Sequence, residues 1–504
     1  MNPDAWARGP TSAAHSQPKT VSVGTLKLGI GASLACVAAS NSVGQRDKAE
    51  VLWRRRKEAA LPKEHTTHPT RRQFLAGSST GVVATLLAAC GQTATQPSTK
   101  SAAPVKISFA AHGDQSWQEI WNRIVTRFNE KHGPNVTAEF FTSEPDGFKK
   151  YFVLIAAGEM WDVFRNEEKR MPEFAKTGGL LDVTALASKD KEANKSDFPE
   201  SVWNEFFWEG KQYGFGHDIS PAVIFYNRKL FKEKGVALPP TKWGEATWTK
   251  EKFLDAAKRL TTGSGAHKIW GFTGNRWWVY QHPWVWANGG GIVSKDDKMM
   301  QLDQPATQET LQWYADLGLV QQVSPNAAEL KDLGNDQKGF ESGRIAMRID
   351  NTSYTIRMRQ YMQQDPSFDW EMAPYPTGKA GAFTRIPNNI VTAYKGTKHP
   401  EATWTFMKFM ASKEATWDAR GMPSRLSVVT QPEVLKRTPN QNWRLLADAG
   451  KVRKSEPRTP YFNDFDSTLR KGWEEVLDGK RSLRDVVSDI KPKLQAILDG
   501  RGAG

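Results

Sequence analysis

The sequence predicts an α/β fold divided into more than one structural unit. Strand-like and helix-like patterns alternate from residue 105 onward, and 504 residues exceed the roughly 250–300 that a single hydrophobic core organises. The composition, 39% hydrophobic and 25% charged, is that of a globular protein, and no apolar run approaches the ~20 residues that span a bilayer. An integral membrane protein is therefore excluded.

The first unit is expected to contain parallel strands. Val105–Phe109 alternates apolar and polar residues as a strand does, and apolar residues then recur at helical spacing from Trp117 to Phe128, before Gly133-Pro134 ends the helix. The same order continues with a strand at Val136–Phe141, a helix at Phe148–Ala157 and a short strand at Trp161–Phe164. Strands that alternate with helices predict a parallel sheet covered on both faces.

In such a sheet the ligand crevice lies beyond the carboxyl ends of the strands. Three segments should meet there: His112 to Asp114, Thr142 to Glu144, and Arg165-Asn166.

A second α/β pattern begins at Ala222–Asn227. It continues with helices at about Lys250–Leu260 and Thr307–Leu317. The last eighty residues are expected to be helical, with Ser482 capping a helix through the Ser-x-x-Asp pattern that ends at Asp485.

The charge distribution argues against nucleic acid as a partner. Half of the net charge of +14 lies in the first 90 residues, and the remainder is spread without a basic block. The two cysteines, Cys36 and Cys90, also lie in the first 90 residues, so neither a disulfide framework nor a thiolate metal site is possible beyond them.

Residues 70–90 are typical of an export signal with a lipid-attachment cysteine. The pair Arg71-Arg72 resembles a twin-arginine motif, a short apolar run follows, and Leu87-Ala88-Ala89-Cys90 resembles the bacterial lipobox, in which the cysteine is acylated. Two or three acyl chains would hold the protein stably at a membrane surface.

The remaining N-terminal segments lack signs of a folded domain. Residues 1–69 form an extension of uncertain role, and Val51 could be the true start of the protein. Residues 91–103, rich in Gln, Thr, Ser and Ala, are expected to be a flexible tether.

An ordered series of segments resembles a known family. The series comprises Trp161-Asp162-Val163, Phe174 to Val183, Tyr213-Gly214, Phe225 to Phe231, Ala287 to Gly290, Phe340 to Met347, Ala373 to Pro376, Glu401 to Trp404 and Gly421 to Arg425. In order and spacing it is similar to the extracellular solute-binding proteins that deliver sugars to ABC importers, the class of the maltose- and glycerol-phosphate-binding proteins.

The resemblance implies a two-lobed, periplasmic-binding-protein-like (type II) α/β fold with solute in the cleft between the lobes. Lobe 1 would comprise residues 104–217 and 387–422, and lobe 2 residues 218–386 and 423–504. It also implies an exported protein, anchored by lipid at the outer face of the cytoplasmic membrane or in the periplasm. Its partners would be a sugar, polyol or sugar-phosphate ligand and the membrane subunits of an ABC permease.

Sugar recognition requires aromatic platforms and planar polar groups. Five of the 20 tryptophans lie between Trp270 and Trp286, and one of the neighbours Trp277 and Trp278 is expected to reach the cleft. The other candidate ligand-binding residues are Asp114, Glu144, Arg165, Asn166, Asp218, Asn351, Tyr354, Arg385 and Tyr461. Each could instead be an ordinary core or surface residue, and Arg165, Arg276 and Arg385 could bind a phosphate or carboxylate.

The alternative function is a lipid-anchored carbohydrate hydrolase, which would need two carboxylates about 5–10 Å apart. Against it, the six histidines after Cys90 show no metal-ligand spacing, and that region has no nucleotide-binding loop and no serine elbow. We therefore predict a binding protein without catalytic residues, cofactor or metal.

Overall fold

The computed structural model describes residues 103–501, apart from 114, 144–146, 418–420 and 436–441. The predicted export signal with Arg71 and Arg72, the lipidation site Cys90 and nearly all of the tether lie outside the described residues. So do the candidate ligand residues Asp114 and Glu144.

A six-stranded sheet, here called the large sheet, contains all of the strands expected near the N-terminus. Its order is β12-β6-β11-β3-β1-β2. β1 pairs in parallel with both β2 and β3, whereas β11 is antiparallel to β3 and β6. The strands are β1 (Val105–His112), β2 (Val136–Ser143), β3 (Val163–Glu167), β6 (Gly214–Ile219), β11 (Asn388–Ala393) and β12 (Met422–Pro423).

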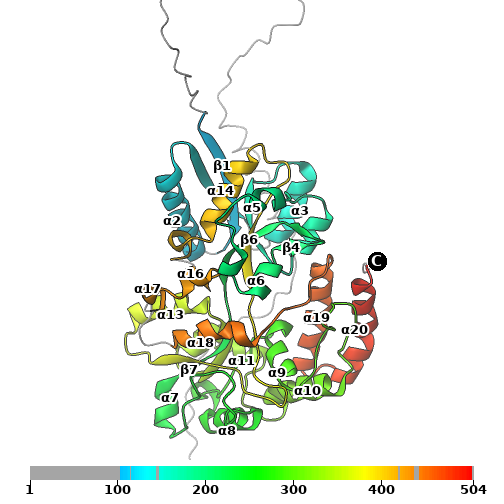
Figure 1. The fold of residues 1–504 in the computed structure, drawn as a ribbon. Helices are drawn as coiled ribbons and strands as arrows, with labels where there is room; N and C mark the ends of the chain where they lie inside the picture. The colour runs from blue at the N-terminus through cyan, green and yellow to red at the C-terminus, as the bar shows by residue number, and fades with distance from the viewer. Residues whose placement is uncertain (1–102, 114, 144–146, 418–420, 436–441, 502–504) are drawn as a thin grey trace, which may run out of the picture. The chain divides into compact units, whose positions relative to one another are not determined.

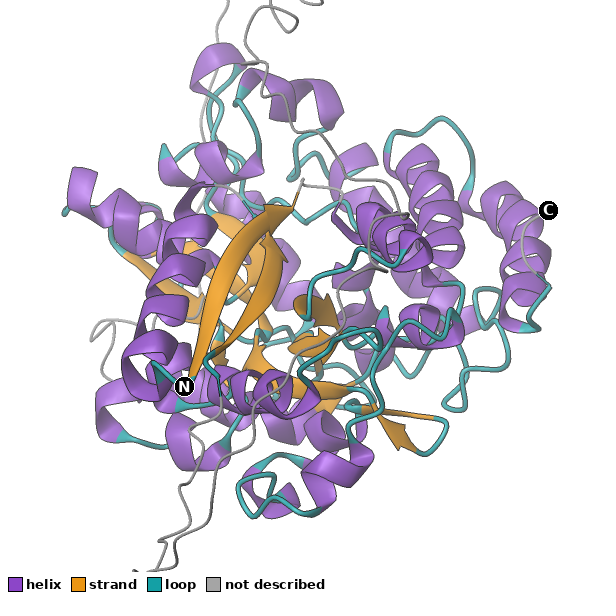
Figure 2. Cartoon of the chain, turned by 90° about the horizontal axis from the view of Figure 1, so that it is seen from above, coloured by secondary structure: helices purple, strands orange, loops and turns teal. Residues whose placement is uncertain are grey.

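Helices pack against this sheet through large aromatic side chains. They include α2 (Gln115–His132), α3 (Gly147–Ala157) and α14 (Pro400–Met410). Phe109 of β1 is fully buried, with its ring centroid 5.6 Å from that of Trp121 on α2 and 5.1 Å from that of Phe406 on α14. Figure 2 shows helices surrounding the strands on both sides. The predicted strand and helix order from residue 105 to 164 is confirmed.

A three-stranded sheet, here called the small sheet, has the order β8-β7-β9 and is entirely antiparallel. Its strands are β7 (Ala222–Asn227), β8 (Met347–Asn351) and β9 (Trp370–Ala373). The chain passes between the two sheets at 220–221, where the Ser220 amide donates to the carbonyl of Pro387 in the second connection. That second connection follows β10 (Thr384–Arg385), which pairs with β13 (Arg453–Lys454).

The helices around the small sheet include two that were predicted from periodicity. α8 (Lys250–Leu260) begins at the N-cap Thr249, and α10 (Pro305–Leu319) extends the predicted helix by two residues at each end. The C-terminal pair, α19 (Phe462–Leu477) and α20 (Leu483–Leu498), packs side by side at the red end of the chain in Figure 1. Ser482 caps α20 as predicted, since its hydroxyl accepts from the Asp485 amide at 3.1 Å.

The other elements lie mostly in the connections between those already described. They are α4 (Met171–Lys176), α5 (Thr184–Ser188), α6 (Glu200–Asn204), β4 (Phe207–Trp208), β5 (Lys211–Gln212), α7 (Arg228–Glu233), α9 (His282–Ala287), α11 (Ala327–Asp332), α12 (Asp336–Glu341), α13 (Tyr354–Gln364), α15 (Lys413–Thr416), α16 (Leu426–Val429), α17 (Pro432–Leu435) and α18 (Trp443–Asp448). The lobe boundaries given above stay a prediction.

Candidate functional site

The carboxyl edge of the large sheet presents polar side chains, as the strand order predicted. Arg165, on β3, is 7% exposed and contacts the Nε2 of His112 on β1 at 2.9 Å, while a second guanidinium nitrogen donates to Asn389 on β11. Asn166 is fully buried, and its Oδ1 accepts from the Glu167 amide at 2.8 Å. These hydrogen bonds hold the side chains of Arg165 and Asn166 in fixed positions on the sheet.

Several nitrogens at this edge have no partner within the described part of the chain. They are the Nε of Arg165, the Nδ2 of Asn166 and the Nδ1 of His112. Burial, with the Arg165 charge, lowers the pKa of His112 to about 3, so its imidazole is neutral at physiological pH. Buried polar groups normally find partners, so these nitrogens are the candidate donors and acceptors of this edge.

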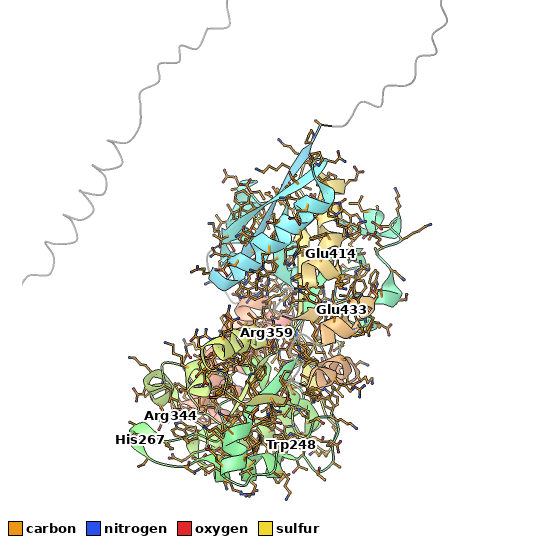
Figure 3. All side chains as sticks on the ribbon, turned by 90° about the vertical axis from the view of Figure 1, so that its left-hand side faces the viewer. Trp248, His267, Arg344, Arg359, Glu414 and Glu433 are labelled. Carbon is orange, nitrogen blue, oxygen red and sulfur yellow. The ribbon has the colours of Figure 1, made fainter. Side chains whose placement is uncertain are left out.

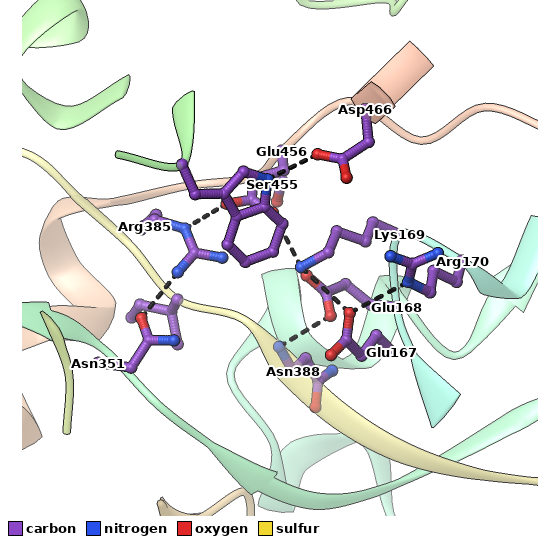
Figure 4. Close-up of polar contacts among 12 residues, drawn as sticks. Glu167, Glu168, Lys169, Arg170, Asn351, Arg385, Asn388, Ser455, Glu456 and Asp466 are labelled. Atoms are coloured by element: carbon purple, nitrogen blue, oxygen red, sulfur yellow. Dashed lines mark hydrogen bonds and ion pairs between the residues drawn. The ribbon is translucent and has the colours of Figure 1, made fainter. Parts of the chain in front are cut away.

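A buried charge network lies beside this edge (Figure 4). The Lys169 ammonium is 3.3 Å from carboxylate oxygens of both Glu167 and Glu456. Glu456 also accepts from the guanidinium of Arg385, which donates to Asn351 on β8 at 2.7 Å. The network thus joins the loop after β3 to β8 and to the segment after β13.

Two buried carboxyl groups here, those of Glu456 and Glu168, differ in pKa. Burial would raise the pKa of Glu456, but Arg385 and Lys169 hold it at about 2. For Glu168, burial dominates and raises the pKa to about 7, although its carboxylate accepts from the Asn388 amide at 3.0 Å. Glu456 is therefore ionised at neutral pH, while Glu168 is close to its titration point.

Trp277 lies against this network from the small-sheet side. Its ring is partly exposed, and the Lys169 ammonium and the Arg385 guanidinium lie 4.9 and 5.6 Å from its centroid. Its indole nitrogen donates to Asp466 on α19 at 2.6 Å, and that of Trp278 donates to the same oxygen at 2.8 Å. One carboxylate therefore orients both indoles.

The structure brings together some of the predicted residues and places others elsewhere. Arg165, Asn166, Trp277, Arg385 and Asn351 belong to the edge or to the network beside it. Trp278 is 3% exposed and packs against Phe465 and His282, so of the tryptophan pair only Trp277 is partly exposed.

Three further candidates have structural contacts of their own. Asp218 is buried and accepts from the Gly421 amide at 2.6 Å. Tyr354 is 3% exposed, packs edge-on against Phe225 and donates to Glu341. Tyr461 contacts Lys176 and donates to the Gly500 carbonyl at 3.0 Å.

Sequence reasoning missed Lys169, Glu456 and Asp466. Lys169 follows Arg165 by four residues, and this proximity was the available signal. Glu456 lies between β13 and α19 with no pattern around it, and Asp466 occupies one position of an amphipathic helix. Only the fold brings these carboxylates to the site.

The part of the chain that the structure describes contains neither a candidate membrane span nor a candidate metal cluster. No helix there is long and apolar enough to cross a membrane. No group of three or more His, Cys, Asp or Glu side chains in that part could hold a metal ion.

Comparison with known proteins identifies the family. The model of the bacterial extracellular solute-binding proteins matches residues 114–417, more than half of the chain. The chain belongs to this family. The resemblance stated from the sequence is therefore confirmed, and the protein is an exported binding protein, not an enzyme.

Individual relatives of this solute-binding protein are distant. A Brucella abortus binding protein is 25% identical over 318 residues, covering 60% of this chain and 72% of the relative. The diacetylchitobiose binding protein of Streptomyces coelicolor is 26% identical over 305 residues, 59% of this chain and 61% of its own.

Solved structures share the fold of this solute-binding protein. An ABC substrate-binding protein from Listeria monocytogenes, in complex with cycloalternan, superposes with a TM-score of 0.70 at 22% identity, covering 79% of this chain and 99% of that one. The GacH receptor of Streptomyces glaucescens, solved unliganded and with acarbose, gives 0.68 at 20% identity, with coverages of 79% and 99%. The predicted two-lobed α/β fold is confirmed. None of these comparisons supports the alternative hydrolase.

Proposed function

We propose that this chain captures a sugar between its two sheets and delivers it to the membrane subunits of an ABC importer. The observation that carries the proposal is a contact between the large-sheet side and the small-sheet side of the molecule. Lys169, from the loop after β3, reaches both Glu456 and the face of Trp277. A solute held there would contact both lobes and favour the closed form, which is how a binding protein signals that it is loaded.

The ligand class follows from the chemistry of this site. A partly exposed indole offers a platform for the C–H face of a sugar ring, and the unpaired nitrogens of Arg165 and Asn166 offer donors to its oxygens. The names of relatives support a sugar, since they mention diacetylchitobiose, cycloalternan and acarbose.

An uncharged sugar or polyol fits better than a sugar phosphate. The cations that could bind a phosphate already have carboxylate partners: Arg165 has Glu167 at 3.7 Å, Arg385 has Glu456, Arg276 has Asp478 at 2.5 Å, and Lys169 has Glu167 as well as Glu456. A phosphate would have to break these pairs, and that would leave buried carboxylates without a countercharge.

The N-terminal residues support membrane attachment. We propose that Arg71-Arg72 direct export and that Cys90 is acylated, with residues 91–103 as the tether. Radiolabelled palmitate incorporated by the producing cells should label the wild-type protein and not the Cys90→Ser variant. Labelling of the variant would contradict the proposal.

The solute proposal is tested by thermal unfolding of the purified protein against maltose, maltotriose, mannotriose, tagatose, mannitol and glucose 6-phosphate. A ligand that binds only the folded state stabilises it by RT ln(1 + [L]/Kd), ~2.7 kcal/mol at a hundredfold excess over Kd. We expect a clear shift with an uncharged sugar that is recovered chemically unchanged. A shift with glucose 6-phosphate alone would contradict the uncharged class, and no shift at all would contradict sugar binding.

A further inference from the structure

Helix α4 and the first residues of α19 form a contact between the two sides of the molecule. Met171 and Phe174 of α4 are buried in the hydrophobic core that contains the strands of the large sheet. Phe465 and Leu469 of α19 are buried in the core that contains residues of all three strands of the small sheet. The contact between these two helices includes none of the residues to which sugar binding was assigned above.

Side chains spaced three residues apart on α4 hold the start of α19. The Asn463 amide is used at both ends, since its oxygen accepts from the Arg170 guanidinium and its nitrogen donates to Oε2 of Glu173 at 2.8 Å. The Lys176 ammonium contacts the Tyr461 hydroxyl and lies 3.7 Å from the centroid of that ring. Arg170, Glu173 and Lys176 share one face of the helix, because side chains at i and i+3 are neighbours on it.

Phe462 is the apolar part of this contact. Its ring is fully buried, with the Arg170 guanidinium 5.0 Å and the Lys169 ammonium 5.8 Å from its centroid. We call Phe462 together with Arg170, Glu173, Lys176, Tyr461 and Asn463 the clasp. Apart from this one ring the clasp is polar, as contacts between domains that move relative to each other usually are. Since Lys169 also belongs to the charge network, the clasp lies next to the proposed place of the solute.

Glu173 is the carboxyl group of the clasp. It faces Arg170 at the start of its own helix, and Asn463 and Asp464 on α19. Burial raises its pKa from 4.5 to about 7, although Arg170 and Asn463 oppose the shift. Because α19 contributes to this burial, an open clasp would return Glu173 toward its ordinary pKa. Closure therefore takes up a proton: it is favoured fully below pH 4.5, and this contribution disappears as the pH rises through 7.

We propose that the clasp is a pH-sensitive latch, which holds the two lobes together over the solute at acidic pH and releases them when Glu173 is ionised. A protonated Glu173 keeps the hydrogen bond from Asn463, whereas an ionised one is repelled by the carboxylate of Asp464. A latch that favours the closed form raises the affinity for a solute that binds that form. The inference rests on the proposed function for its effect on sugar, and it adds regulation by pH to that same site.

The latch is tested without sugar by hydrogen–deuterium exchange of the full-length protein, read by mass spectrometry at pH 4 and pH 8. Each variant is compared with the wild type at the same pH, so the effect of pH on intrinsic exchange cancels. Glu173→Gln stays neutral and should slow exchange in α4 and at residues 461–465 at pH 8, with no change at pH 4. Asn463→Ala removes the shared amide and should speed exchange in these segments at pH 4. Helix α8, which contributes no residue to the clasp, is the internal control.

The effect on the solute is tested by calorimetry with the sugar found in the thermal panel. At pH 8, Glu173→Gln should bind it roughly fivefold more tightly than the wild type, a coupling at the low end of the usual range. At pH 4 the two proteins should bind it equally. Glu168 also titrates near pH 7, but its contribution is the same in both proteins and cancels when they are compared at one pH.

The possible results separate the latch from the proposed function. Equal exchange of the wild type and Glu173→Gln at pH 8 would overturn the latch whatever the sugar result. Equal affinity of the two at pH 8 would overturn its role in solute binding. If no sugar of the panel binds, the proposed function fails, and the exchange measurement still decides whether the clasp opens with pH. If Glu173→Gln does not fold, the comparison of Asn463→Ala with the wild type decides: faster exchange at pH 4 alone supports the latch, and a change of equal size at pH 4 and pH 8 overturns it.

Discussion

The two sides of the proposed cleft differ in how their polar groups are satisfied. At the edge of the large sheet, nitrogens of His112, Arg165 and Asn166 have no partner within the described residues. On the other side, both indoles donate to Asp466, and Arg385 is paired with Glu456 and Asn351. Nη2 of Arg385 and Oε2 of Glu456 make no hydrogen bond within the described residues either, but the charges of the second side are paired, Arg385 with Glu456 and Asp466 with Arg470. We therefore call the second side saturated in the sense of charge, and the first side unsaturated.

This difference suggests that the two sides have different roles in binding the solute. Unpaired buried donors cost folding free energy, so they persist where a ligand supplies the missing acceptors. A saturated network holds its members in one geometry, and it therefore fixes the orientation of the Trp277 ring. The large-sheet edge would then provide hydrogen bonds to the solute, and the small-sheet side a rigid platform.

The largest effect is expected on the free energy of unfolding when the charge network of the saturated side loses its shared carboxylate. Glu456→Gln removes the carboxylate shared by Lys169 and Arg385, both fully buried. Breaking a buried ion pair typically costs about 3–5 kcal/mol. We expect a loss near the lower end, because Glu167 and Asn351 remain as partners, measured by urea unfolding.

Glu433→Gln is the matched control. The side chain of Glu433, labelled in Figure 3, is 46% exposed and pairs with that of the partly exposed Lys413, and such surface pairs contribute about 0–1 kcal/mol. Equal losses in the two variants would show that the Glu456 network does not stabilise the fold in this way.

The next largest effect is expected on sugar affinity when the Trp277 ring is removed. Trp277→Ala should weaken sugar binding by about 2–3 kcal/mol, roughly 30- to 150-fold, as truncation of a central aromatic contact does. Isothermal titration calorimetry with the sugar found in the thermal panel measures it. Trp313→Ala is the control, because Trp313 is also partly exposed but contacts Trp284 and Phe253 elsewhere on the small-sheet side. An unchanged affinity in Trp277→Ala would remove Trp277 from the site.

A smaller effect is expected on the unsaturated side. Asn166→Ala removes an unpaired Nδ2 together with one local acceptor, so we expect a loss of about 1 kcal/mol in sugar affinity, roughly fivefold, with little change in stability. Calorimetry and thermal unfolding measure the two quantities, and Asn122→Ala, on the exposed face of α2, is the control. A large loss of stability with normal affinity would mean that Asn166 serves the sheet and not the solute.

The sequence predicted the fold better than the site, for a physical reason. Strand and helix periodicity are local, so β1 to β3 and their helices were placed correctly, and the edge residues Arg165 and Asn166 followed from the strand ends. Glu456 and Asp466 reach the site only because β13 pairs with β10 and α19 packs beside Trp278. Contacts between residues so far apart in sequence leave no local pattern.

Aromatic residues show the same limit. One of the neighbours Trp277 and Trp278 was expected to reach the cleft. Both indole nitrogens donate to one oxygen of Asp466, and the two rings differ mainly in burial. Tyr354 follows a strand end just as Arg165 belongs to one, but it is buried against Phe225. Position at a strand end is therefore not sufficient to place a residue in this site.

The smallest effect is expected on stability, at a contact between the two sides of the cleft where α4 meets α19. Glu173, on α4 beside the large sheet, accepts from Asn463 on α19 at 2.8 Å, with Arg170 and Asp464 also nearby. Burial raises its pKa from an ordinary value of 4.5 to about 7, although Arg170 and Asn463 oppose the shift. The folded protein thus keeps a proton that the unfolded chain has lost between these two values, so stability from this group is complete below pH 4.5 and disappears as the pH rises through 7.

Glu173→Gln mimics the protonated carboxyl at every pH. We expect the variant and the wild type to be equally stable at pH 4, and the variant to be more stable at pH 8 by about 1 kcal/mol or less, since solvent screens a partly exposed group. Urea unfolding across this range measures the difference. If the difference in stability does not depend on pH, Glu173 is ionised in the folded protein. The contact between α4 and α19 would then rest on an ionised carboxylate beside Arg170, as the contacts of Glu456 rest on Arg385.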